Sequence, residues 1–127
     1  MKFRIYKNSM LKNRTLYQSF KNALKGLFYS IKKERNIKIQ MLFGFVVFLL
    51  ASLFSFTYYE WIVLTFAVFF IIVAELFNTS IEYLIDLITL EYNKKAKKSK
   101  DIAASAVLIT SMISLGIIIS LFIRKVL

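Results

Sequence analysis

The 127-residue sequence contains no cysteine, no histidine and no proline, and it has only three glycines. Without cysteine no disulfide can form, and the sequence is silent on the redox compartment. The absence of both cysteine and histidine excludes zinc sites and Ser-His or Cys-His triads, so a bound metal must be a hard cation held by oxygen ligands. The absence of proline and the scarcity of glycine predict few loops and long helices.

Acidic residues are also scarce, with seven Asp and Glu against 18 Lys and Arg, which gives a formal net charge of +11. The basic residues gather before residue 39 and between Lys94 and Lys100, where they flank apolar runs. We interpret them as a positive-inside signal and as attraction to anionic lipid headgroups, and we expect no nucleic-acid partner. The sequence contains no P-loop, GxGxxG or HExxH motif.

Hydrophobic residues make up 58% of the chain and aromatic residues 17%, which is typical of a membrane protein. Three apolar segments, at about 39–58, 61–88 and 102–123, are each long enough to cross a hydrocarbon core of about 30 Å. Because the first apolar run begins only near Ile39, we expect no cleaved signal peptide. The sequence predicts an all-α membrane protein that forms a single domain over residues 1–127.

The charges flanking the spans predict their orientation. The stretch Tyr58–Trp61 between the first two spans has interfacial aromatics and neither Lys nor Arg, whereas the Lys94–Lys100 stretch is strongly basic. We therefore expect the N-terminus and a Lys94–Lys100 loop to be cytoplasmic and a turn at Tyr58–Trp61 to be external. Arg124 and Lys125 would then be external, a smaller cluster that the larger ones outweigh.

Ahead of the first span, apolar residues recur at helical spacing over about residues 15–33, with lysines and amides on the opposite face. This pattern predicts an amphipathic helix that lies in the membrane interface. A surface helix that only anchors the chain explains the pattern equally well.

Four polar residues interrupt the second span. At 100° per residue, Glu75, Asn78, Glu82 and Asp86 fall within an arc of about 80°. Carboxylates at membrane depth are costly and usually mark a functional site. The simpler alternative is that Glu82 and Asp86 only form ion pairs with nearby lysines.

Depth separates the roles of these acids. Glu75 follows fourteen uncharged residues from Trp61, about 21 Å of helix, and Glu82 lies about 10 Å further along. The two are too far apart to chelate one ion, so Glu82 needs a partner from another helix, for which Glu34 is the best candidate. Glu75, in drier surroundings, suits a general base for a lipid hydroxyl.

Lys100 and Asp101 stand at the start of the third span, followed by the small residues Ala103–Ala106. Lys100 is placed to neutralise a phosphoryl group during transfer. The small residues permit close helix approach, and plain packing is their simplest explanation.

These patterns resemble the prokaryotic diacylglycerol kinase and undecaprenol kinase family of small integral-membrane lipid kinases. The resemblance extends from about Asn13 to Leu108. It rests on four motifs: Glu75-x-x-Asn78-Thr79-x-Ile81-Glu82-x-x-x-Asp86, Ala96-x-x-x-Lys100-Asp101-x-Ala103-Ala104-x-Ala106-Val107-Leu108, Phe20-x-x-Ala23-x-x-Gly26 and Glu34-Arg35-Asn36.

The resemblance implies a homotrimer with active sites between subunits, in the bacterial cytoplasmic membrane, that phosphorylates a lipid alcohol with ATP and Mg²⁺. By position, Glu75 matches the catalytic base, and Glu34 and Glu82 match the metal carboxylates. Asn78 matches an active-site residue, and we expect Lys100 to be catalytic together with Glu75 and Asn78. The positions matching nucleotide contacts are Glu82, Glu91, Tyr92, Asn93, Lys100 and Asp101.

The acceptor is less strongly specified. Gln40 stands where many relatives have His or Glu, and the segment Lys12–Leu16 resembles undecaprenol kinases more than diacylglycerol kinases. We expect undecaprenol to be converted to undecaprenyl phosphate. The alternatives are a diacylglycerol kinase that makes phosphatidic acid and, in another class, a non-enzymatic transporter or channel subunit whose acids carry ions.

Overall fold

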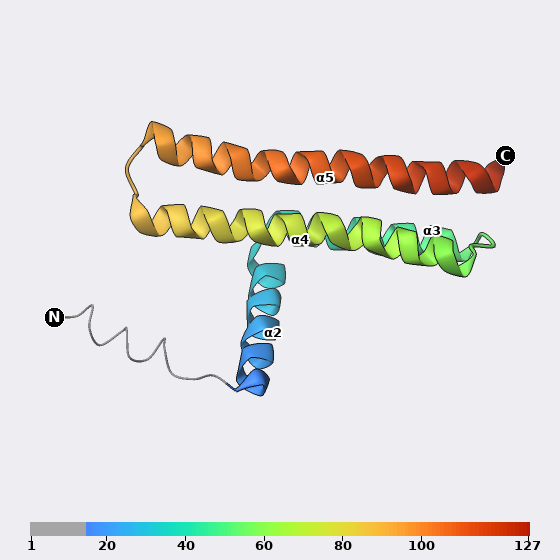
Figure 1. Cartoon of the computed structure of the whole chain (residues 1–127), viewed down its shortest axis with the longest axis horizontal. Coiled ribbons are helices and arrows are strands. Elements are labelled where there is room, and N and C mark those ends of the chain that lie inside the picture. The colour runs from blue at the N-terminus through green and yellow to red at the C-terminus, as the bar shows by residue number, and fades with distance from the viewer. Residues whose placement is uncertain (1–14) are drawn as a thin grey trace.

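The computed structural model describes residues 15–127, so the Lys12–Arg14 part of the resemblance lies outside the described residues. Four helices make up this part of the chain: α2 Leu16–Lys33, α3 Arg35–Ser52, α4 Tyr58–Ile88 and α5 Lys94–Val126. The last three run side by side, and α2 projects away from them at a steep angle from the start of α3 (Figure 1). Helices α3, α4 and α5 are long and apolar enough to cross a membrane, which confirms the predicted all-α chain with three candidate spans.

Helix α2 begins at a capping box formed by Thr15 and Gln18. The Thr15 hydroxyl accepts a hydrogen bond from the Gln18 backbone, and the Gln18 side chain accepts one from the Thr15 backbone. This reciprocal capping fixes the first turn. No residue of α2 is buried, and apolar side chains such as Leu16 and Phe20 are exposed. The helix therefore offers its apolar face to something other than its own chain.

The connection between α3 and α4 differs from the prediction. Helix α3 begins at Arg35 and ends at Ser52, and α4 begins at Tyr58. The turn predicted at Tyr58–Trp61 is wrong, because those residues form the first turn of α4. The physical reason is a capping box in which Thr57 accepts from the Glu60 backbone while the Glu60 carboxylate accepts from the Thr57 backbone.

The loop predicted at Lys94–Lys100 is also wrong, because these residues are the first two turns of α5. The connection from α4 is residues 89–93. Asn93 ends it by accepting hydrogen bonds from the backbones of Lys95 and Ala96, at 2.8 and 3.3 Å. Lysine is a good helix former and no breaker follows the cap, so the helix continues into the apolar span.

The end of the bundle that contains residues 53–57, called the turn end below, is filled with apolar side chains. Its core joins all three spans through Val47, Ala51, Leu64, Ala67, Val68, Ile118 and Leu121. Gly44 lies so close to α4 that a Cβ there would stand 2.6 Å from Cγ1 of Val68. Packing at this end is therefore tight enough to fix how α3 meets α4.

Aromatic rings and one ion pair complete the turn end. The Trp61 ring stacks on Phe48 with centroids 6.1 Å apart, and Phe56 lies between Trp61 and Phe122. Lys125, near the end of α5, donates to the Glu60 carboxylate at 2.7 Å and to the Ser55 carbonyl at 2.9 Å. These contacts bind the end of α5 to the α3–α4 connection.

Candidate active site

Glu75 is almost completely enclosed, with 4% of its surface exposed, although it carries a carboxylate in the middle of α4. Gln40 of α3 donates from Nε2 to Oε2 of Glu75 at 3.3 Å. A buried carboxylate needs a donor of this kind to offset its lost hydration. Gln40 stands where many relatives have His or Glu, and its contact with Glu75 was not predicted. A polar amide at the start of an apolar span suggests a contact with another helix, but the sequence around Gln40 does not identify the partner.

Asn78 and Glu82 form the next part of the site. Asn78 is buried and donates from Nδ2 to Oε1 of Glu82 at 3.0 Å, while its own Oδ1 is buried and finds no partner among the described residues. A cavity of about 370 Å³ opens beside them. It is lined by Asn36, Glu75, Asn78, Glu82, Ala104, Val107, Leu108 and Ser111. Three of the four residues of the predicted stripe therefore face one cavity.

Asp86, the fourth member, does not line this cavity. Its carboxylate accepts a hydrogen bond from Nζ of Lys100 at 2.5 Å, which links α4 to α5. Asp86 therefore pairs with a nearby lysine, as the simpler alternative predicted. Glu82 does not pair with a lysine, because its described partner is the Asn78 amide.

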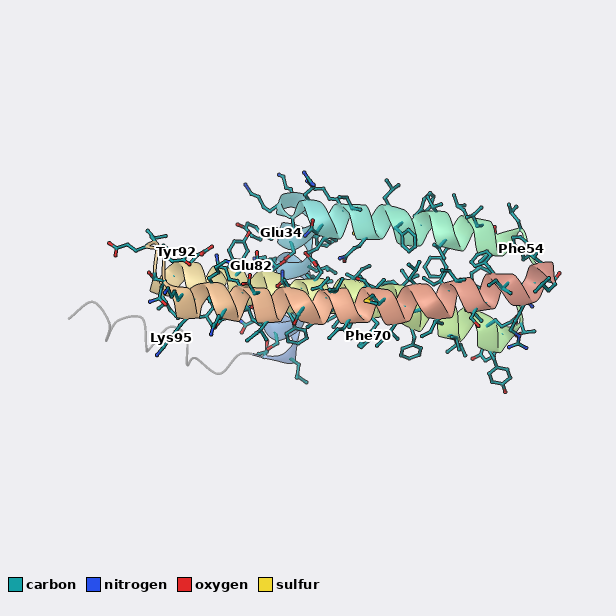
Figure 2. All side chains as sticks on the ribbon, turned by 90° about the horizontal axis from the view of Figure 1, so that it is seen from above. Glu34, Phe54, Phe70, Glu82, Tyr92 and Lys95 are labelled. Carbon is teal, nitrogen blue, oxygen red and sulfur yellow. The ribbon has the colours of Figure 1, made fainter. Side chains whose placement is uncertain are left out.

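Glu34 lies at the break between α2 and α3 and is half-buried. The phenol of Tyr83, on α4, donates to Oε1 of Glu34 at 2.6 Å. Glu34 and Glu82 lie in the same stretch of the bundle, whereas Tyr92 and Lys95 lie at its far end (Figure 2). The contact with Tyr83 was missed, because the two residues are 49 positions apart.

Within residues 15–127, no three acidic side chains gather into a metal-binding group. Glu82 and Asn78, whose Oδ1 has no partner in the described chain, nevertheless both line the Glu75 cavity. This donor set fits a hard cation such as Mg²⁺, which is normally held by one or two carboxylates with water and phosphate oxygens completing the shell.

Most of the residues matched to nucleotide contacts lie elsewhere, around the connection from α4 to α5. A second cavity, of about 650 Å³, is lined in part by Glu91, Tyr92, Asn93 and Lys100. Asp101 lies outside this lining, with its carboxylate 3.9 Å from Lys97, and Glu82 belongs to the first cavity. Most of the predicted site residues therefore line two separate cavities. The first contains the buried carboxylate of Glu75, and the second contains Lys100 beside the connection from α4 to α5.

Comparison with known proteins identifies the family. The model of the prokaryotic diacylglycerol kinase family matches residues 21–122. Undecaprenol kinase of Bacillus subtilis (strain 168) is 31% identical over 109 residues, which cover 86% of this chain and 89% of that protein. Diacylglycerol kinase of Helicobacter pylori (strain ATCC 700392 / 26695) is 38% identical over 102 residues, covering 72% and 77%. Diacylglycerol kinase of Synechocystis is 34% identical over 98 residues, covering 76% and 56%.

The family match covers most of α2 and α5, all of α3 and α4, and the residues that line both cavities. The family match and the relatives decide between a kinase and a non-enzymatic channel or transporter subunit in favour of the kinase. The chain belongs to the prokaryotic diacylglycerol kinase family, and it is a membrane phosphotransferase that acts on a lipid alcohol.

Proposed function

We propose that this chain is a single membrane-embedded kinase domain that transfers the γ-phosphoryl group of ATP to undecaprenol. The observation that carries the proposal is Glu75, a buried carboxylate that lines a cavity in the middle of a candidate membrane span. A lipid hydroxyl can reach this position from within the bilayer. A soluble acceptor would have to leave water to do so, which favours a lipid as the substrate.

In this proposal Glu75 takes the proton from the acceptor hydroxyl, and Gln40 holds the carboxylate in place through its 3.3 Å hydrogen bond. Glu34, Glu82 and Asn78 supply oxygens for Mg²⁺. When bound, Mg²⁺ would offset the negative charge of the nucleotide phosphates. Lys100 leaves Asp86 to neutralise the phosphoryl group during transfer.

The nucleotide would lie along the second cavity, against Glu91, Tyr92, Asn93 and Lys100, with Asp101 on the adjoining turn of α5. We propose a homotrimer with active sites between subunits. The separation of the two cavities on one chain supports it, because a neighbouring copy could complete each active site.

We also propose that the protein lies in the bacterial cytoplasmic membrane with the α4–α5 connection in the cytoplasm. The basic residues of the first turns of α5 support this orientation. The chain has no cysteine, so single cysteines can be introduced and tested with an impermeant thiol reagent on intact cells. Ser55→Cys should label and Lys97→Cys should not. The opposite pattern would separate the nucleotide cavity from cytosolic ATP and refute the orientation.

The acceptor is tested directly. Similarity to an undecaprenol kinase over 89% of its length supports undecaprenol, while 38% identity to a diacylglycerol kinase favours diacylglycerol as the second candidate. Purified protein in mixed micelles receives equal mole fractions of the two lipids with ATP and Mg²⁺. We expect a higher kcat/KM for undecaprenol. A higher value for diacylglycerol would overturn the acceptor and leave the lipid-kinase function intact.

A further inference from the structure

Tyr83 joins two parts of the molecule that the sequence separates. It follows Glu82 directly on α4, and its phenol donates to Oε1 of Glu34 at the break between α2 and α3. Its ring also lies against the ring of Tyr29 on α2, with centroids 6.3 Å apart and planes tilted by 54°. Residues from two helices, α2 and α4, and from the break after α2 therefore meet at a single phenol.

The hydrogen-bond partner of Glu34 is a phenol, although basic residues surround Glu34 in the sequence. Lys32, Lys33 and Arg35 flank Glu34 within two positions, yet no ion pair of the described residues includes its carboxylate. An ammonium or guanidinium would neutralise the carboxylate and compete with a cation. A phenol holds one oxygen by a hydrogen bond and leaves the full negative charge in place.

The geometry also leaves one Glu34 oxygen available. Oε1 accepts from Tyr83, and no hydrogen bond among residues 15–127 engages Oε2. One turn of α4 thus carries both Glu82, a proposed metal carboxylate, and the phenol that restrains the other proposed metal carboxylate. Partners that orient metal-binding side chains in this way commonly change metal affinity by about 10–100-fold when they are removed.

We propose that Tyr83 is a positioning residue for the divalent cation: its hydroxyl holds the Glu34 carboxylate through Oε1 and leaves Oε2 for the cation. The inference rests on the metal role proposed for Glu34. Its consequence is that the hydrogen bond from Tyr83 holds the end of α2, where Glu34 lies, against α4.

The experiment measures Mn²⁺ binding to the full-length protein in micelles, without nucleotide or lipid, by the loss of the free-ion EPR signal. Tyr83→Phe removes only the hydroxyl and should weaken Mn²⁺ binding by about tenfold or more. Tyr59→Phe is the matched control, because it removes an exposed phenol from the other end of the same helix. It should bind Mn²⁺ as the wild type does, and both variants should keep the wild-type melting temperature.

Two further measurements separate a positioning role from a general structural one. The Mg²⁺ concentration for half-maximal activity should rise in Tyr83→Phe, while kcat at saturating Mg²⁺ stays near the wild-type value. Adding Tyr83→Phe to Glu34→Gln should cause no further loss of Mn²⁺ affinity, because the hydroxyl then has no carboxylate to orient. A full additional loss would show that Tyr83 acts through another group and would overturn the inference.

Glu34→Gln distinguishes the possible failures. If Glu34→Gln weakens Mn²⁺ binding and Tyr83→Phe does not, the inference about Tyr83 is wrong and the metal role of Glu34 stands. If both bind Mn²⁺ like the wild type, Glu34 is not a metal ligand, and the inference fails together with that part of the proposed function.

Discussion

The two ends of the three-helix bundle are built from the same helices with opposite chemistry. At the turn end, side chains such as Leu64 and Ala51 are completely enclosed, and the charges of Glu60 and Lys125 are paired. The other half of the bundle, called the polar end, begins near the middle of α4, where Glu75 and Asn78 border a cavity and Oδ1 of Asn78 is buried without a partner in the described chain.

This difference shows how α4 combines two tasks. Its first half packs against α3 and α5, and its second half places carboxylates beside open space. Unpaired buried polar atoms lower stability, so a chain that needs them for function must obtain its stability elsewhere. We therefore expect substitutions at the polar end to reduce turnover and leave stability unchanged, and substitutions at the turn end to do the reverse.

The largest expected effect is the loss of turnover in Glu75→Gln. The amide is nearly isosteric but takes no proton, so we expect kcat to fall by about 10²–10⁴-fold or more. Binding of Mg-ATP should be spared, because Glu75 lies about 10 Å along the helix from Glu82. Thermal unfolding should show no loss of stability. A comparable loss of nucleotide affinity would contradict the separation of base from metal ligand.

The next largest effect is expected at the proposed metal carboxylates. Glu34→Gln and Glu82→Gln should each weaken metal-dependent nucleotide binding by about tenfold or more, since each removes an anionic ligand. The double variant should be little worse than either single variant, because residues that act as one unit are not additive. Titration calorimetry with Mg-ATP provides the measurement. Cleanly multiplicative losses would mean that the two residues do not share an ion.

At the turn end, Gly44→Ala should destabilise the fold by about 1–3 kcal/mol, because the new methyl group meets the stiff Val68 side chain. Gly116→Ala is the control, since nothing lies within 4 Å of a Cβ at that position. It should be neutral or slightly stabilising, because alanine favours a helix over glycine. Thermal unfolding in micelles compares the two. Equal effects would show that the close approach of α3 to α4 carries no energetic weight.

The smallest expected effect is at the ion pair of the turn end. Lys125→Met should lower the melting temperature slightly and leave kcat unchanged, because it removes the donor shared by Glu60 and the Ser55 carbonyl. Arg124→Met, one residue away, should have no such effect. Combining Lys125→Met with Glu60→Gln should add little to either. A loss of turnover in Lys125→Met would break the division between the two ends.

Local sequence patterns predicted part of this arrangement. The apolar spacing over about residues 15–33 predicted α2 with bounds close to those observed, although the Thr15–Gln18 capping pattern was not used. The 100° rotation per residue placed Glu75, Asn78 and Glu82 on one face, and they line one cavity. A capping signal of the same kind at Thr57 and Glu60 was present but not used, and the connection was misplaced as a result.

The contacts between helices were beyond the reach of local patterns. Gln40 and Glu75 are 35 positions apart, and Glu34 and Tyr83 are 49 apart. Nothing in either segment specifies the rotation of α3 against α4, which depends on the close approach at Gly44. The Lys94–Lys100 prediction failed for another reason, because a run of like charges does not prevent a helix when a good cap precedes it.

The unequal lengths of the helices indicate where the edge of the hydrocarbon layer would cross the bundle. Helix α3 has 18 residues, about 27 Å, which nearly equals the hydrocarbon thickness, and α2 departs from its start as an interfacial helix would. The hydrogen bond from Tyr83 to Glu34 marks this level on α4. Glu75 lies eight residues, about 12 Å, on the membrane side of the mark, and Ile88 lies about 8 Å on the other side. With the roles proposed above, the lipid would reach Glu75 from the hydrocarbon side of this level, and the nucleotide would reach the α4–α5 connection from the aqueous side.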